Sequence, residues 1–350
     1  MISGKKTEKE KNIKLTNQSN NKNSNLYNFA KKVIVIGGAN IDIKGRSFSQ
    51  LGKITSNPGV VNITLGGVGR NIAHNLALLK VPVIFLSVIG DDEWGRKILK
   101  ETGGAGVDMR NVKISSRNPT GIYIAILNEM GEMVVAVSDM KVSEEINVKY
   151  LKSKLDFIRK SQMIVIETNL PEESIKYVSK ICAEEGIKLI VDPVSVKKSK
   201  KLKKVLNNID YMTPNKEELE SLLGGIKLQN DEDIIREVQS LRNRSNGIKN
   251  IVLTLGKRGV FLSGKEAGVK QNAQKRKIID QFIPSYKVEA VEVTGIGDAL
   301  VAGLVYGIYS NYSLDVATKY GLAAAALTVS TPYTVCPGMK SELLRILVEK

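Results

Sequence analysis

The chain has 350 residues, of which 42% are hydrophobic and 25% charged, a composition typical of a soluble protein with one large α/β domain or two smaller ones. It has no apolar run near the roughly 20 residues that cross a bilayer and no hydrophobic signal segment, so we expect a cytoplasmic protein without a membrane partner. Two distant cysteines and a single histidine exclude catalytic triads and histidine-based metal sites.

The net charge of +16 is concentrated in a few segments. Residues 1–32 contain eight lysines and two glutamates, and Lys197–Lys204 and Lys270–Lys277 are further basic runs. These runs lack interleaved aromatic residues, so they predict weak attraction to polyanions and no specific nucleic-acid partner. The low apolar content of residues 1–31 predicts a disordered basic tail ahead of one folded domain over 32–350.

In chain order, buried strands are followed by helices. A strand at Val33–Ile36 ends in a glycine turn, and a glycine loop from Gly66 leads into a helix with Ile72, Leu76 and Leu79 on one face. Further strands are predicted at Val83–Ile89, Met163–Ile166, Leu189–Val191 and Ile251–Leu255, with a helix at Glu172–Glu185. This alternation predicts a three-layer αβα, Rossmann-like core in which helices cover both faces of a parallel sheet.

Two segments break this rhythm. Asn57–Leu65 and Thr120–Val137 alternate apolar and polar residues, with a turn at 129–132. They predict a small, half-exposed β-sheet from segments of about 44–65 and 115–139. Such a sheet would make a natural lid over a site.

The most informative stretch is Gly295-Ile296-Gly297-Asp298, followed by an apolar helical run from Ala299 to Ile308. Free backbone N–H groups and the helix dipole favour an anion at a helix N-terminus, and glycines allow a phosphate to approach closely. Asp298 is therefore a candidate general base for phosphoryl transfer to an alcohol. The alternative is an ordinary helix start with an acidic first-turn residue.

Two glycine-rich turns are candidates for sugar binding. Asn40 and Asp42 follow the first strand, at the sheet edge where open α/β proteins bind ligands, although an Asx turn also explains them. The second turn lacks the third glycine of a dinucleotide fingerprint, so we expect Gly67 and Asn71 to close around a sugar. Arg70 adds a planar donor without an evident structural need.

Later segments are candidates for nucleotide and metal binding. Asn215 and Glu218 share one helix face and could organise waters on Mg²⁺, or form a capping box. Thr254 and Gly256 follow a strand and could contact nucleotide, although a plain hairpin turn fits nearly as well. The single histidine, His74, has no metal-ligating companions and is expected to be structural.

Together, and in this order, these segments resemble the ribokinase-like (PfkB) carbohydrate kinases over about residues 32 to 340. The resemblance implies an ATP- and Mg²⁺-dependent kinase domain with a β-sheet lid, and a homodimer is expected. It assigns Asp298 as catalytic base beside an anion hole of Gly295, Ile296 and Gly297. The remaining implied sites are sugar contacts at Asn40, Asp42, Gly67, Asn71 and Glu167, nucleotide contacts at Thr254 and Gly256, and an Mg²⁺ pair at Asn215 and Glu218. From the residues themselves we add Arg70 as a substrate contact and Gly259 as a nucleotide contact.

Two further expectations follow from the resemblance. Ile296 stands where the family usually has alanine, and because the hole uses backbone amides this should alter packing more than chemistry. Many members also use K⁺ near this loop, with Glu292 and Thr294 as possible contributors here.

Within the family, Gly38–Gly45, Ser56–Gly59 and Gly67–Asn71 are most similar to the pseudouridine kinases. That similarity implies phosphorylation of the 5′-hydroxyl of pseudouridine. A role for Arg70 in reading the base is our own hypothesis. Two alternatives are open: a kinase of the same family acting on ribose, a ketohexose or adenosine, or a noncatalytic protein that binds nucleosides or nucleic acid.

Overall fold

The structure is a computed structural model that describes residues 32–243, 247–265 and 278–349. The expected tail over residues 1–31 and the basic run Lys270–Lys277 lie outside the described residues. Within these ranges, no helix combines the length and the apolar character that a membrane span requires.

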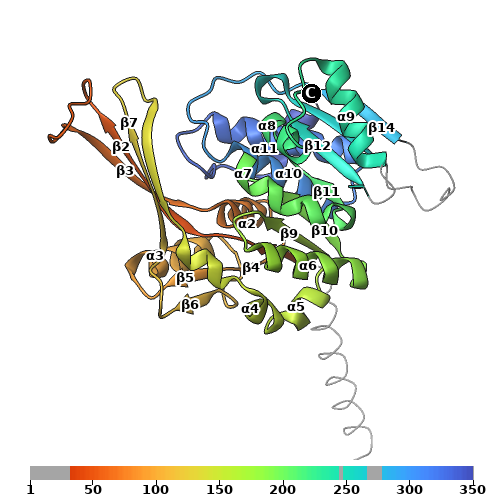
Figure 1. The fold of residues 1–350 in the computed structure, drawn as a ribbon, viewed down its shortest axis with the longest axis horizontal. Coiled ribbons are helices and arrows are strands. Elements are labelled where there is room, and N and C mark those ends of the chain that lie inside the picture. Colours follow the sequence, from red (N-terminus) through yellow and green to blue (C-terminus); the bar gives the residue numbers. More distant parts are fainter. Residues whose placement is uncertain (1–31, 244–246, 266–277, 350) are drawn as a thin grey trace, which may run out of the picture.

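The largest element is an eight-stranded sheet with the order β14-β13-β12-β11-β10-β9-β1-β4 (Figure 1). From β4 to β12 neighbouring strands are parallel, whereas β13 and β14 pair antiparallel at one edge. The strands are β1 (Val33–Ile36), β4 (Val83–Leu86), β9 (Met163–Glu167), β10 (Lys188–Asp192), β11 (Tyr211–Met212), β12 (Asn250–Thr254), β13 (Val260–Lys265) and β14 (Ile278–Ile283).

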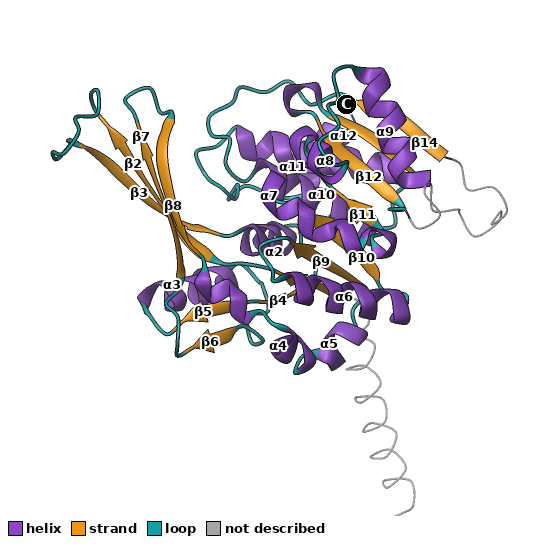
Figure 2. Cartoon of the chain, viewed as in Figure 1, coloured by secondary structure: helices purple, strands orange, loops and turns teal. Residues whose placement is uncertain are grey.

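Helices cover both faces of this sheet (Figure 2). Successive side chains of a strand point to opposite faces, and in β1 Val33 and Val35 join one hydrophobic core while Ile34 and Ile36 join the other. The first core includes residues of α2 (Val68–Leu78), α3 (Glu93–Gly104), α10 (Ile296–Tyr309), α11 (Leu314–Val329) and α12 (Ser341–Val348). The second includes α4 (Val148–Lys152), α5 (Leu155–Arg159), α6 (Glu172–Glu185), α8 (Lys216–Leu222) and α9 (Asp231–Asn243). The predicted three-layer αβα core is confirmed.

A close helix pair explains the small residues that follow Asp298. Helix α10 packs against α11, and a Cβ added at Gly303 would lie 2.4 Å from the carbonyl oxygen of Tyr320. The small side chains therefore let the two backbones approach, which holds the N-terminus of α10 at the sheet edge.

A second sheet of four strands, in the order β3-β2-β7-β8, projects from the αβα body (Figure 1). Its strands are β2 (Asn40–Ser47), β3 (Gly59–Gly66), β7 (Gly121–Leu127) and β8 (Met133–Asp139). The predicted hairpin with its turn at 129–132 is present between β7 and β8. A short third sheet pairs β5 (Val88–Gly90) with β6 (Lys113–Ser115).

The structure differs from the sequence prediction in three respects. The expected strand Val83–Ile89 is broken at Ser87, where the chain leaves the large sheet for β5. Asn40 and Asp42, expected in a turn, begin strand β2. The strands β11, β13 and β14 were not predicted, because β11 is only two residues long and β13 and β14 form an antiparallel edge.

Candidate functional site

The site is built around the N-terminus of α10, at the edge of the sheet where β9 and β10 end. Gly295 is the N-cap residue of α10, with a left-handed φ of 81°. A Cβ at this position would lie 2.1 Å from the carbonyl oxygen of Thr334, so both the backbone conformation and the close packing require glycine. The first-turn N–H groups have no partner within the helix, an arrangement that favours an anion at this end.

Asp298 lies in this first turn and is 9% exposed. Its Oδ2 accepts a hydrogen bond of 2.7 Å from Nδ2 of Asn71 on α2. Burial raises the pKa of Asp298 to about 7, and the negative charge of Glu167 adds to this, while the Asn71 hydrogen bond opposes it. A carboxyl with such a pKa can accept a proton from an alcohol near neutral pH.

Arg70 is 3% exposed, and its guanidinium is directed at protein partners. It donates to the carbonyl oxygens of Gly66 and Leu65 and to Oδ1 of Asn71. It also contacts Nδ1 of His74, whose pKa is lowered to about 4 by burial and by the charge of Arg70. These contacts give Arg70 a structural need that the sequence did not reveal; its role in reading a base stays a prediction.

The structure brings together the residues that were expected to bind a sugar: Asn40, Asp42, Gly67 and Asn71. Nδ2 of Asn40 donates to Oδ1 of Asp42 at 2.6 Å, and burial raises the pKa of Asp42. Gly67 has a φ of 98°, and a Cβ there would lie 2.5 Å from the carbonyl oxygen of Gly38. The two glycine turns therefore touch, and they place the polar side chains of β2 beside the start of α2.

Glu167, at the end of β9, is fully buried beneath these turns. It accepts hydrogen bonds from the backbone N–H groups of Gly38 at 2.7 Å and Asn169 at 2.6 Å. Both hydrogen bonds hold the protein backbone. Its expected contact with a substrate stays a prediction.

Asn215 and Glu218 form a complete capping box at the start of α8. Oδ1 of Asn215 accepts from the N–H of Glu218 at 2.8 Å, and Glu218 Oε2 accepts from the N–H of Asn215 at 2.9 Å. The capping alternative is thus realised in the structure. A role for the pair at Mg²⁺ stays a prediction.

Asn215 also lines a cavity of about 540 Å³ together with Thr254, Gly256 and Arg258. Thr254 ends β12, and a short 3₁₀ turn at Gly256–Arg258 leads into β13, so the expected hairpin turn is present as well. Gly259 does not line this cavity, and a Cβ there would lie 2.1 Å from the carbonyl oxygen of Ile283. Gly259 therefore allows the close approach of β14.

The sequence reasoning missed Asp192, which ends β10 as Glu167 ends β9. Burial raises its pKa well above the usual value, and the charges of Asp298, Glu218 and Glu167 raise it further. An acidic residue directly after a buried strand was the available signal.

Among the described residues no three Asp, Glu, His or Cys side chains could hold a metal ion by themselves. The carboxylate oxygens of Asp192, Asp298, Glu218 and Glu167 fit Mg²⁺, because this ion keeps several waters and also binds phosphate oxygens. The positive charge of Mg²⁺ would offset the negative charges of these carboxylates.

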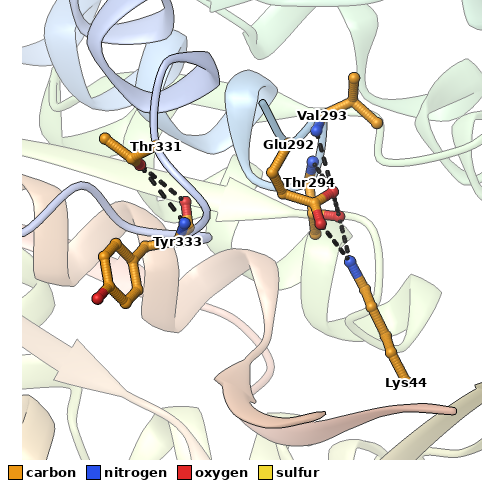
Figure 3. Close-up of polar contacts among 6 residues, drawn as sticks. All are labelled: Lys44, Glu292, Val293, Thr294, Thr331 and Tyr333. Atoms are coloured by element: carbon orange, nitrogen blue, oxygen red, sulfur yellow. Dashed lines mark hydrogen bonds and ion pairs between the residues drawn. The ribbon is translucent and has the colours of Figure 1, made fainter. Parts of the chain in front are cut away.

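Lys44 was also missed, and it joins the four-stranded sheet to the turn before α10 (Figure 3). Its Nζ lies 2.7 Å from Oγ1 of Thr294 and 3.2 Å from Oε2 of Glu292. Partial burial alone would raise the pKa of Glu292, but hydrogen bonds from Thr294 and the Lys44 ammonium hold it below its usual value. The two residues expected near K⁺ therefore contact an ammonium group of the chain itself.

A family model for the pfkB family of carbohydrate kinases matches residues 30–338. The chain belongs to this family. It is 33% identical to the pseudouridine kinase of Escherichia coli over 319 residues, which cover 91% of this chain and 96% of the relative. It is 25% identical to a ribokinase of Haemophilus influenzae, with coverages of 86% and 92%. The fold matches the ribokinase of Arabidopsis thaliana with a TM-score of 0.76 at 23% identity, over 91% of this chain and 99% of the other.

This pfkB kinase is a phosphotransferase that uses an alcohol group as acceptor. The family assignment and the ribokinase-like fold agree with the geometry at α10, where a buried acid lies beside an anion-binding helix end.

Proposed function

We propose that the protein transfers the γ-phosphate of ATP to the 5′-hydroxyl of pseudouridine. One observation supports the chemistry above all: Asp298 lies at the N-terminus of α10, bonded to Asn71, with a pKa of about 7. The similarity to pseudouridine kinase over nearly the whole of both chains supports the choice of acceptor. Use of ATP points to the cytoplasm as the place of action.

In the proposed reaction Asp298 accepts the 5′-hydroxyl proton as the oxygen attacks the γ-phosphorus. The new O–P bond forms while the bond to the leaving ADP oxygen breaks, so no covalent enzyme intermediate is needed. The N–H groups of Gly295, Ile296 and Gly297 stabilise charge on the transferring group. Asn40, Asp42, Gly67 and Asn71 hold the sugar, with Glu167 supporting the turn beneath.

ATP would approach along the cavity that Thr254 and Gly256 line beside Asn215. Bound Mg²⁺ would neutralise phosphate charge and orient the γ-phosphate, with Asn215 and Glu218 holding its water ligands. Gly259 would support this nucleotide region through the turn that it closes, without lining the cavity itself. Arg70 would support the binding of the nucleoside from beneath the site, through its hydrogen bond to Asn71.

The four-stranded sheet is proposed as the lid of a kinase domain over residues 32–350. Strand pairing places Asp42 level with Thr64 and Tyr123, so one face of this sheet offers polar groups to the substrate. Closure of that face would exclude water and limit wasteful hydrolysis of ATP.

The opposite face of the lid supports the expected homodimer. Its exposed apolar side chains lie in register on β3, β7 and β8: Val61, Ile63, Ile124, Val135 and Val137. A contiguous apolar face of this kind is typical of an interface. We propose that a second copy covers it. Sedimentation of Val61→Lys, compared with Lys53→Ala in the same lid, would test this, because only the former should shift the protein toward a monomer.

The experiment that tests the function measures ADP release with pseudouridine, uridine, ribose and adenosine as separate acceptors. We expect the highest kcat/KM with pseudouridine, and a product whose phosphorus NMR spectrum shows coupling to the 5′-methylene protons. A preference for ribose or adenosine would leave the kinase assignment intact and overturn the acceptor. Tight nucleoside binding without ADP release from any acceptor would favour the noncatalytic alternative.

A further inference from the structure

Lys44 links two parts of the site that are 248 residues apart in the chain. It lies on strand β2, two residues after Asp42 and on the same face of the lid, because alternate residues of a strand point to one side. Its partners Glu292 and Thr294 lie directly before Gly295, the N-cap of α10. Figure 3 shows the lysine reaching from its strand to this turn.

Glu292 organises the turn that precedes the anion-binding end of α10. Its Oε1 accepts hydrogen bonds from the N–H of Val293 at 2.9 Å, the N–H of Thr294 at 3.0 Å and the hydroxyl of Thr294 at 2.7 Å. Its other oxygen, Oε2, faces the Lys44 ammonium. Oε1 of Glu292 thus accepts hydrogen bonds from three groups of the turn, and Oε2 interacts with one cation.

A carboxylate at this position poses an electrostatic problem for a kinase. Glu292 lies three residues before Gly295, where a transferring phosphoryl group would bind, and two negative groups repel strongly in a partly desolvated site. A cation between the carboxylate and the hole would offset this repulsion. The side chains of Lys44 and Glu292 are 26% and 30% exposed, so solvent screens their interaction only in part.

We propose that the Lys44 ammonium is a built-in monovalent cation of the site and replaces a free K⁺ at Glu292 and Thr294. This proposal rests on the proposed kinase function and names a positioning residue for it. A free ion and the ammonium would need the same two oxygen atoms, so the lysine and K⁺ exclude each other. The lysine also belongs to the lid, so formation of this contact couples the lid strand of Asp42 to the turn of the anion hole.

The test compares wild type and Lys44→Met in KCl and in tetramethylammonium chloride at equal ionic strength. The wild type should have the same kcat in both salts, within about twofold. Lys44→Met should lose roughly tenfold or more of kcat in tetramethylammonium chloride, the scale of one lost electrostatic contact in an active site. KCl should restore most of this loss, since the methionine side chain leaves the two oxygens free for the ion.

A second readout does not depend on catalysis. The melting temperature of Lys44→Met should rise with KCl relative to tetramethylammonium chloride, because an ion that binds only the folded state stabilises it. The melting temperature of the wild type should show no such difference. Lys53→Met is the matched control, since it removes an exposed lysine from the same lid without contacting Glu292, and it should behave as wild type in both assays.

Three outcomes overturn the proposal: a wild type that needs K⁺, a Lys44→Met variant with unchanged kcat, or a loss that K⁺ does not restore. If Lys44→Met does not fold, Lys44→Gln gives the same comparison, and Glu292→Gln is the control that lacks the carboxylate. In Glu292→Gln the carboxylate is gone, so K⁺ should have no effect on rate or melting, and a K⁺ effect there counts against the proposal. Failure of the proposed function would appear separately, as a wild type that releases no ADP in either salt.

Discussion

Helices α8 and α10 begin at the same edge of the sheet, and each has an acidic residue in its first turn, yet the two acids have different environments. Glu218 in α8 accepts a hydrogen bond from the N–H of its own N-cap residue, Asn215, so it completes a capping box. Asp298 in α10 follows a glycine N-cap with no side-chain capping bond, and its hydrogen bond comes from Asn71 on another helix. One acid stabilises its helix, whereas the other is available for proton transfer.

The difference arises from the residue at the N-cap. Asparagine supplies an acceptor for the N3 amide and invites a reciprocal glutamate, whereas glycine supplies none and leaves the first-turn N–H groups for a ligand. Burial then raises the pKa of both acids, to about 7 in Asp298. Three substitutions test this difference between the two acids.

The largest effect is expected at Asp298. Asp298→Asn keeps the shape of the side chain and its acceptor for Asn71 but removes the base, so kcat should fall by roughly 10² to 10⁴. In the wild type kcat/KM should rise with pH as Asp298 ionises near pH 7. Steady-state ADP release from pH 5.5 to 9 measures both. A variant with near-normal turnover would remove Asp298 from the role of base.

The same substitution should stabilise the protein at alkaline pH. The pKa of Asp298 is raised from 3.8 to about 7 on folding, so the folded state binds this proton more tightly than the unfolded state. Its contribution is full below pH 4 and is lost as pH rises to about 7. Since one pKa unit corresponds to about 1.4 kcal/mol, Asp298→Asn should gain up to about 4 kcal/mol at pH 8 and little at pH 4. Urea unfolding at both pH values measures the gain in the free energy of unfolding. A gain that is independent of pH would contradict the prediction.

A smaller effect is expected at Asn71. Its amide donates to the ionised form of Asp298 and lowers that pKa, so Asn71→Ala should move the midpoint of the kcat/KM profile upward from about 7. A hydrogen bond to a charged group contributes about 1.5 to 3 kcal/mol, so kcat at pH 7 should fall roughly 10- to 100-fold. An unchanged midpoint with a reduced rate would show that Asn71 acts on the substrate alone.

The smallest effect on stability is expected at Glu218. Glutamine at this position keeps the capping box, so Glu218→Gln should change the free energy of unfolding by about 0.5 kcal/mol or less. If the acid also organises water on Mg²⁺, the Mg²⁺ concentration for half-maximal rate should increase. Glu217→Gln, which removes an exposed charge from the same turn, is the control. Equal Mg²⁺ dependence in both variants would leave Glu218 as a helix cap only.

Much of the framework followed from local patterns. Continuous β-branched strands predicted a sheet covered on both faces, and the alternating segments predicted the smaller sheet with its turn at 129–132. The glycines before Asp298 predicted a helix start, which the structure has at Ile296. The antiparallel strands β13 and β14 were not predicted, since the pairing direction of a strand depends on its neighbour in space.

The site was only partly predictable. Asn40, Asp42, Gly67 and Asn71 were expected together, and the structure brings them together near Asp298. The contacts of Arg70 were not predictable, because its acceptors are carbonyl groups that any sequence supplies. Lys44 lies within the Gly38–Gly45 segment, but that segment did not indicate the partners of the lysine, which lie near the other end of the chain.

The turns, the helix starts and the strands covered on both faces follow from local sequence, since these features depend on residues a few positions apart. The N-cap residues Asn215 and Gly295 made one acid a cap and left the other without that role. The partner of Asp298 came only with the fold, because Asn71 and Asp298 are separated by 227 residues and meet when α2 packs against α10. The fold also decided that an ammonium group lies against Glu292, across 248 residues. Charges and pKa values follow such long-range neighbours, so they appear only once the chain is folded.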